Sequence, residues 1–117
     1  SAAIVDKHVD EFELAGLTPA ASSLIDAPHV AEARVVFECR VTQIVRLDDA
    51  AGSPTQTRVV FGEVVGVHID KDLLVDGIYQ TALAHPISRG GGPATYFGIT
   101  EGERFEMPRP EQRRPEA

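Results

Sequence analysis

The sequence predicts a mainly β, antiparallel domain that carries a short N-terminal helix. Two long segments, residues 34–47 and 58–70, alternate apolar and polar side chains with the period of two that is typical of half-buried strands. The residues between them, 48–56, include glycine, serine and proline and predict a turn or hairpin loop. We therefore expect the two strands to pair as an antiparallel hairpin.

The N-terminal region predicts a helix followed by an irregular connection. The helix is expected from apolar residues at helical spacing, namely Val5, Val9 and Phe12. Gly16 is expected to end it. Ser1 is the only candidate for its N-cap, which suggests that the natural chain begins earlier. Residues 17–33 predict an extended connection with one short strand at residues 23–26.

The apolar residues of the first strand share one face, which predicts that this face is buried. They are Val35, Phe37, Cys39, Val41, Val45 and Leu47. A thiol on such a face is usually a small buried hydrophobe, so Cys39 is not expected to be a nucleophile. On the second strand, Gly62 and Gly66 fall on one side and indicate packing, a barrel bend or a ligand. Glu63 lies among apolar residues, where an ion pair with an arginine such as Arg40 is expected rather than catalysis.

The C-terminal third predicts shorter elements. An apolar patch at residues 73–75 precedes the turn pair Asp76-Gly77, and residues 95–99 and 104–107 predict a short hairpin. Residues 108–117, with three prolines and five charges, predict a tail. About four strands are too few to close a barrel, so we expect the open edges to be covered by a second copy, another chain or further sequence.

Composition excludes several function classes. Eighteen acidic residues against eleven basic ones give a net charge of −7, so neither nucleic acid nor an anionic membrane is expected as a partner. The single cysteine is compatible with a reducing compartment, and a cytoplasmic location is expected. The four histidines lie in four separate segments without metal-ligand spacing, so no metal site is expected. The sequence also lacks the loop motifs of classical hydrolases, nucleoside triphosphatases and dinucleotide-binding proteins.

Residues 85–96 carry the largest collection of groups that could bind a ligand. It combines an imidazole, a guanidinium, consecutive glycines and an aromatic ring: His85, Arg89, Gly90, Gly91 and Tyr96. Glycine amides can surround an anionic oxygen, an arginine can pair with phosphate, and a tyrosine can stack on a ring. The segment therefore suits an anionic or planar ligand. The alternative is a flexible glycine loop with a surface arginine.

Four stretches, in order along the chain, resemble the flavin reductase-like, FMN-binding split-barrel family. They are residues 9–19 (VDEFELAGLTP), 37–45 (FECRVTQIV), 62–70 (GEVVGVHID) and 86–110, the last containing PISRGG, Tyr96 and FEMPRP. The resemblance implies an antiparallel Greek-key split barrel, commonly a homodimer, with FMN (or FAD) in a groove near the dimer interface. Residues 1–107 would be the C-terminal portion of that domain, so the barrel and the flavin site would be incomplete in this chain.

The resemblance also implies a function. Members of the family reduce flavin with NADH or NADPH, often to supply a partner monooxygenase, and the site residues would be His85, Arg89, Gly90, Gly91 and Tyr96. The first hypothesis is therefore an NAD(P)H-dependent flavin reductase, in which the cofactors carry the redox step and no protein nucleophile is required. The alternatives are a non-enzymatic FMN-binding electron-transfer protein of the same fold and a β interaction domain without flavin.

Overall fold

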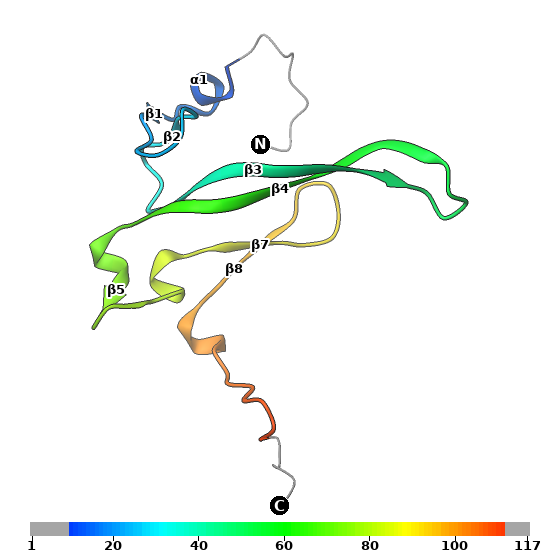
Figure 1. Cartoon of the computed structure of the whole chain (residues 1–117). Coiled ribbons are helices and arrows are strands. Elements are labelled where there is room, and N and C mark those ends of the chain that lie inside the picture. Colours follow the sequence, from blue (N-terminus) through cyan, green and yellow to red (C-terminus); the bar gives the residue numbers. More distant parts are fainter. Residues whose placement is uncertain (1–9, 112–117) are drawn as a thin grey trace, which may run out of the picture.

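The computed structural model describes residues 10–111 and is mainly β with one short helix, as predicted (Figure 1). The elements are α1 (Glu11–Ala15), β1 (Pro19–Ala20), β2 (His29–Val30), β3 (Val35–Asp48), β4 (Pro54–Ile69), β5 (Leu74–Val75), β6 (Ile78–Tyr79), β7 (Ile87–Arg89) and β8 (Tyr96–Gly98), with 3-10 turns at 71–73, 82–84 and 101–103. The strands form four separate two-stranded antiparallel sheets, so no sheet closes on itself.

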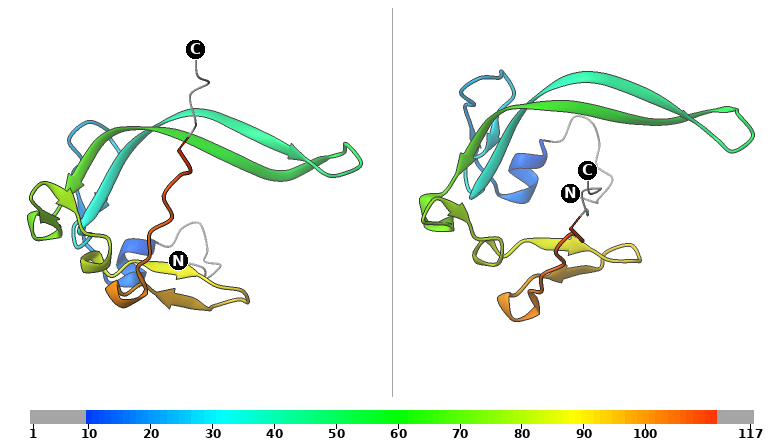
Figure 2. Two further views of the ribbon diagram at one scale, coloured as in Figure 1. Left: turned by 90° about the horizontal axis from the view of Figure 1, so that it is seen from below. Right: turned by 60° about the horizontal axis from the view of Figure 1, so that its bottom comes forward.

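The β3–β4 hairpin is the largest element, and its antiparallel pairing confirms the prediction. Its turn is shorter than expected because the Asp49 carboxylate accepts the backbone N–H groups of Ala51 and Ser53, at 3.0 and 2.9 Å. Gly52 adopts a positive φ of 84° in this turn. The ladder therefore resumes at Pro54 and not at Arg58. Figures 1 and 2 show the tip of this hairpin projecting beyond the rest of the described chain.

The ladder has three register shifts, and the two that lie away from the turn decide which residues share a face of the hairpin. Glu38 opposes Gly66 and Cys39 opposes Val64, so Val65 is an extra residue on β4. A second shift between Val41 and Gln43 makes Thr42 extra on β3. Opposed residues lie on the same face, and each bulge reverses the alternation of its strand. Simple alternation along the sequence is therefore wrong beyond these points.

Because of the bulges, one set of apolar side chains lies on a single face of the hairpin, which we call the open face. It comprises Phe37, Cys39, Val41, Ile44, Val60, Val64 and Val67. The prediction that the apolar face of β3 is buried is wrong for this chain, because Cys39 is exposed and the other six residues are 48–64% exposed. Gly62 and Gly66 also fall on opposite faces, since Gly62 opposes Val41 whereas Gly66 opposes Glu38.

The other face of the hairpin, which we call the covered face, lies against residues 18–31 at its base, whereas Val45, Val59 and Phe61 farther along it are 37–45% exposed. It carries Glu38, Arg40, Glu63 and His68 at its base. Arg40 opposes Glu63 across the ladder, but its guanidinium donates to the carbonyl oxygen of Leu24 at 2.6 Å. A carbonyl of the covering segment thus takes the role that was predicted for the Glu63 carboxylate.

The N-terminal segment confirms the end of the predicted helix and corrects the strand after it. Asp10 caps α1 by accepting the N–H of Phe12, and Gly16 ends the helix in the left-handed region at φ 70°. The predicted N-cap at Ser1, with Val5 and Val9, lies outside the described residues. The strand predicted at residues 23–26 is wrong: that stretch bends, and strands form on either side of it as β1 and β2.

The C-terminal third confirms one predicted turn and corrects one hairpin. Asp76 and Gly77 both have positive φ, 52° and 76°, and join β5 to β6 in a two-residue turn. β8 pairs with the earlier strand β7 and not with residues 104–107, which form no strand. Residues 101–103, which were expected to be the hairpin turn, form a 3-10 turn instead. Arg104, directly after it, forms an ion pair with Glu101.

The described chain is open and has little core. Its radius of gyration is 19.7 Å, against about 13 Å for a compact domain of this size. Leu73, in the 3-10 turn after β4, is the one fully buried hydrophobic side chain among the described residues. Within residues 10–111, no helix is long and apolar enough to cross a membrane.

Candidate functional site

The loop between β7 and β8 brings together Arg89 and Tyr96, two of the predicted site residues. They oppose each other across the ladder. The Arg89 guanidinium donates to the Tyr96 hydroxyl at 2.9 Å and to the carbonyl oxygens of Gly92 and Pro93, both at 3.0 Å. Its central carbon lies 4.9 Å from the centre of the Tyr96 ring. Three of the five guanidinium N–H groups are engaged within the loop, so two remain to reach a ligand.

The glycines of this loop have different roles. The Gly90 N–H donates to the Thr95 carbonyl at 2.8 Å, and a Cβ on Gly90 would lie 2.7 Å from Cε2 of Phe97. The Phe97 ring in its present position therefore leaves no room for a larger residue here. Gly91 has open space where a Cβ would stand. Within residues 10–111, the amides of Gly91 and Gly92 make no hydrogen bond, so they can accommodate an anionic oxygen.

Replacing Gly90 with alanine is expected to displace the Phe97 ring and to destabilise the β7–β8 hairpin by no more than about 1 kcal/mol, because that ring is exposed and can move. Chemical shifts of the loop amides and the thermal midpoint would measure the effect. Gly91→Ala is the matched control and should leave both unchanged, since nothing lies within 4 Å of its Cβ position. Equal effects of the two substitutions would contradict this assignment.

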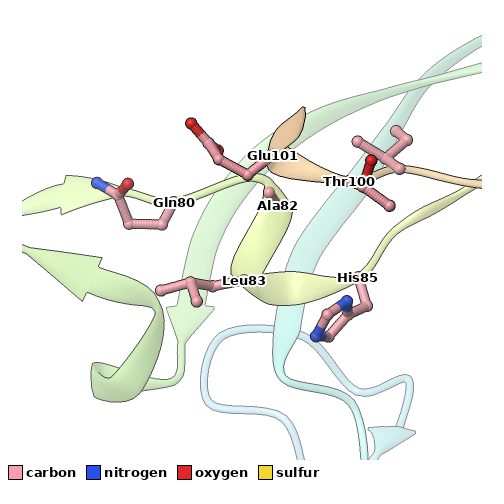
Figure 3. Close-up of a pocket in the computed structure, with 7 residues that line it drawn as sticks. Gln80, Ala82, Leu83, His85, Thr100 and Glu101 are labelled. Atoms are coloured by element: carbon pink, nitrogen blue, oxygen red, sulfur yellow. The ribbon is translucent and has the colours of Figure 1, made fainter. Parts of the chain in front are cut away.

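His85 lies apart from the other predicted site residues. It adopts a left-handed conformation, φ 50°, at the end of the 82–84 turn. Figure 3 shows it beside a pocket of about 410 Å³ whose lining includes neither Arg89 nor Tyr96. The lining residues are Gln80, Ala82, Leu83, His85, Ile99, Thr100 and Glu101. The structure thus divides the predicted set into the β7–β8 loop and this separate, mostly apolar pocket.

A polar cluster on the covered face was missed by the sequence analysis. The Glu38 side chain is only 1% exposed, although alternation placed it on the polar side of its strand. Its oxygens accept the backbone N–H groups of Ser23 and Leu24, at 3.0 and 2.7 Å, and contact Nε2 of His68. His29 stacks on His68 with ring centres 5.5 Å apart. Two backbone N–H groups and an imidazole therefore meet around one buried carboxylate, and His29 stacks behind that imidazole.

The cluster anchors residues 18–31 to the hairpin and does not form an open substrate site. Gly66 opposes Glu38, and a Cβ on Gly66 would lie 3.2 Å from Cδ1 of Leu24. The glycine thereby lets the backbone of the covering segment reach the carboxylate. Glu38 is seen to oppose this glycine only once the strand register is known, so the sequence alone gives little sign of the contact.

Folding stability is expected to depend on the ionisation of Glu38. The backbone N–H of Ser23, followed by the bonds from His68 and Leu24, lowers the pKa of Glu38 from 4.5 to about 2. A carboxylate whose pKa is lower in the folded state stabilises the fold above its unfolded value and loses that contribution as pH falls. The thermal midpoint should therefore decrease as the pH is lowered from 4.5 to about 2. Glu38→Gln should flatten this decline, and an unchanged profile in the variant would contradict the assignment.

Within residues 10–111, no three histidine, cysteine, aspartate or glutamate side chains lie close enough together to hold a metal ion.

The described chain is mainly β, and its fold matches a solved structure with a split barrel domain. A family model described as "Flavin reductase like domain" matches residues 1–88, so the chain belongs to the flavin reductase-like family.

Three relatives illustrate this membership. Component B of nitrilotriacetate monooxygenase from Bacillus cereus is 34% identical, with a TM-score of 0.78 over 91% of this chain and 50% of that one. A Shewanella frigidimarina protein, described as a flavin reductase with a split barrel domain, is 27% identical, with a TM-score of 0.69 over 90% and 50%. An uncharacterized protein of Halalkalibacterium halodurans is 34% identical over 100 residues, 86% of this chain and 46% of its own length. The chain thus spans about half the length of these relatives.

Proposed function

We propose that this chain is part of an FMN-binding flavin reductase that transfers hydride from NAD(P)H to flavin and delivers the reduced flavin to a partner monooxygenase. The observation that carries the proposal is the similarity, over nine-tenths of the chain, to a component of nitrilotriacetate monooxygenase. The family match over residues 1–88 supports the flavin-dependent class. Assembly as a homodimer and a cytoplasmic location are parts of the same proposal.

We propose a domain organisation on the basis of these comparisons. Residues 1–107 would be the C-terminal portion of a flavin reductase-like domain, and residues 108–117 a tail. Coverage of about half of each relative supports this division. The open sheets of the described chain are consistent with it, because a split barrel needs further strands for closure.

The β7–β8 loop fits one part of a flavin nucleotide. The amides of Gly91 and Gly92 and the two remaining donors of Arg89 suit phosphate oxygens or the polar edge of the flavin ring. Gly90 fixes the loop through Thr95 and Phe97, and Tyr96 offers an aromatic face. His85 would contribute from its separate pocket, to the flavin or to the nicotinamide nucleotide.

The redox chemistry of such a reaction is supplied by the bound flavin. The residues of this chain would orient the reactants. Arg89 would neutralise negative charge, while its bonds to Tyr96, Gly92 and Pro93 hold the guanidinium in one position. A fixed guanidinium loses little freedom on binding, and alignment of the two rings is the main contribution a protein makes to hydride transfer.

Arg89→Ala in the full-length protein is expected to weaken binding of FMN or of the nicotinamide nucleotide by about 1 to 3 kcal/mol, the usual range for hydrogen bonds to charged groups. Separate titrations of FMN and of NAD(P)H would identify the ligand. Arg104→Ala is the matched control, because Arg104 is an exposed arginine engaged with Glu101 and Glu106 and should leave both affinities unchanged. Unchanged affinities in Arg89→Ala would make this residue a purely structural part of the loop.

The function itself is tested by NAD(P)H oxidation with free FMN, measured on the full-length protein. The proposal expects bound FMN and consumption of NAD(P)H with matching reduction of flavin. Binding of FMN without oxidation would favour the electron-transfer alternative. A colourless protein that binds no FMN would favour a β interaction domain.

A further inference from the structure

Arg34, the residue before β3, joins the base of the long hairpin to the turn that lines the His85 pocket. Its guanidinium donates from Nε to the Asp70 carboxylate at 3.4 Å and from Nη1 to the carbonyl oxygen of Leu83 at 3.2 Å. Asp70 follows β4, and its backbone N–H donates to the Arg34 carbonyl oxygen at 2.9 Å. One side chain at the base of the hairpin therefore contacts a turn that lies 49 residues later in the chain.

Within the described chain, the turn at residues 82–84 has no other hydrogen bond to a distant segment. Its remaining backbone bonds are local, from the Ala84 N–H to the Thr81 carbonyl at 3.2 Å and from the His85 N–H to the Ala82 carbonyl at 3.1 Å. Among residues 10–111, Arg34 is thus the one hydrogen-bonding anchor of this turn on the hairpin.

His85 follows this turn directly and has an uncommon backbone conformation. Its φ of 50° lies in the left-handed region, where a residue other than glycine stays only if its surroundings hold it. Leu83 and His85 both line the pocket, as Figure 3 shows. A displacement of the Leu83 carbonyl would therefore move the His85 imidazole relative to the pocket.

Stability alone does not account for the contacts of Arg34. The Arg34 and Asp70 side chains are 44% and 43% exposed, so their ion pair contributes little to the free energy of unfolding. The planar guanidinium, however, presents several donors in a rigid geometry and can hold two acceptors in a fixed relation to each other. Such a contact is suited to fixing the position of the turn.

We propose that Arg34 is a positioning residue, which fixes the Leu83 carbonyl and thereby holds the His85 imidazole where the ligand of the pocket contacts it. The inference rests on the proposed function, in which His85 contacts the flavin or the nicotinamide nucleotide. Arg34 acts through His85 and does not touch the ligand.

A double-mutant cycle on the full-length protein tests the proposal. FMN, NAD⁺ and NADP⁺, which bind without reacting, would be titrated separately against wild type, Arg34→Met, His85→Ala and the double variant. We expect both single substitutions to weaken the same ligand, Arg34→Met by roughly 10-fold, and Arg34→Met to have no further effect once His85 is alanine. Arg46→Met is the matched control, because Arg46 donates to the Thr55 carbonyl at 2.9 Å near the other end of the hairpin. It should leave all affinities unchanged.

The His85 imidazole also provides a measurement that needs no ligand. Its C2–H proton resonance, assigned by its loss in His85→Ala, should shift in Arg34→Met and stay in place in Arg46→Met. An unmoved resonance would overturn the proposal, as would additive effects of the two substitutions on affinity. A wild-type protein that binds neither FMN nor a nicotinamide nucleotide would refute the proposed function and with it this inference, an outcome distinct from the first two.

Discussion

Glu38→Gln is expected to release residues 18–31 from the β3–β4 hairpin. The glutamine amide can accept one of the two backbone N–H groups, from Ser23 or Leu24, but its NH2 group would face the other. The substitution also removes the charged partner of His68. Because an unsatisfied buried donor is costly, the thermal midpoint should fall by roughly 5 °C or more. Amide hydrogen exchange at Ser23 and Leu24 should accelerate in parallel.

Glu32→Gln provides a matched control for this prediction. The Glu32 carboxylate also accepts a backbone N–H, from Thr18 at 3.0 Å, but its surroundings are exposed. Water can replace that contact, so the change in thermal midpoint should be small. If both variants lose the same stability, or if exchange at Ser23 and Leu24 is unaffected, Glu38 does not anchor the segment.

Leu73→Ala is expected to destabilise the fold by about 2 to 5 kcal/mol, the range for truncating a buried leucine. Leu73 is 0% exposed, and its backbone is fixed by hydrogen bonds with Asp70 and Gln80. Equilibrium urea denaturation of the full-length protein would measure the loss.

Leu83→Ala is the comparison for this substitution, because Leu83 is 48% exposed and its truncation should cost well under about 1 kcal/mol. A similar loss for the two leucines would show that Leu73 does not belong to the core in solution.

The hairpin could be predicted from sequence because alternation and a turn-rich linker are local signals. Its two faces could not, because one extra residue at Val65 and another at Thr42 reverse the alternation, and nothing in the residue types marks a bulge. The error concerning Cys39 has a different cause. Its apolar neighbours were predicted correctly, but they and Cys39 are exposed in the described chain, because alternation reports the apolar face and not what covers it.

The candidate site could likewise be predicted from the sequence only in part. The residues of the β7–β8 loop are neighbours in sequence, so their grouping was predictable. The pairing of β7 with β8 was not, because residues 104–107 were predicted as the partner strand and residues 87–89 carry no alternation long enough to mark a strand. Glu38, His68 and His29 come from distant segments, and their meeting depends on register and on the close approach that Gly66 permits. Such long-range contacts leave little trace in a single sequence.

The central claim, that this chain belongs to a working flavin reductase, is tested most directly by one anaerobic measurement. The full-length protein would be mixed with FMN and then with NADH or NADPH, while the absorbance of the flavin and of the nicotinamide is followed. Loss of the oxidised-flavin band together with stoichiometric oxidation of one nicotinamide nucleotide, much faster than in free FMN, is the predicted result. Flavin reduction no faster than without the protein, for both nucleotides, would contradict the account.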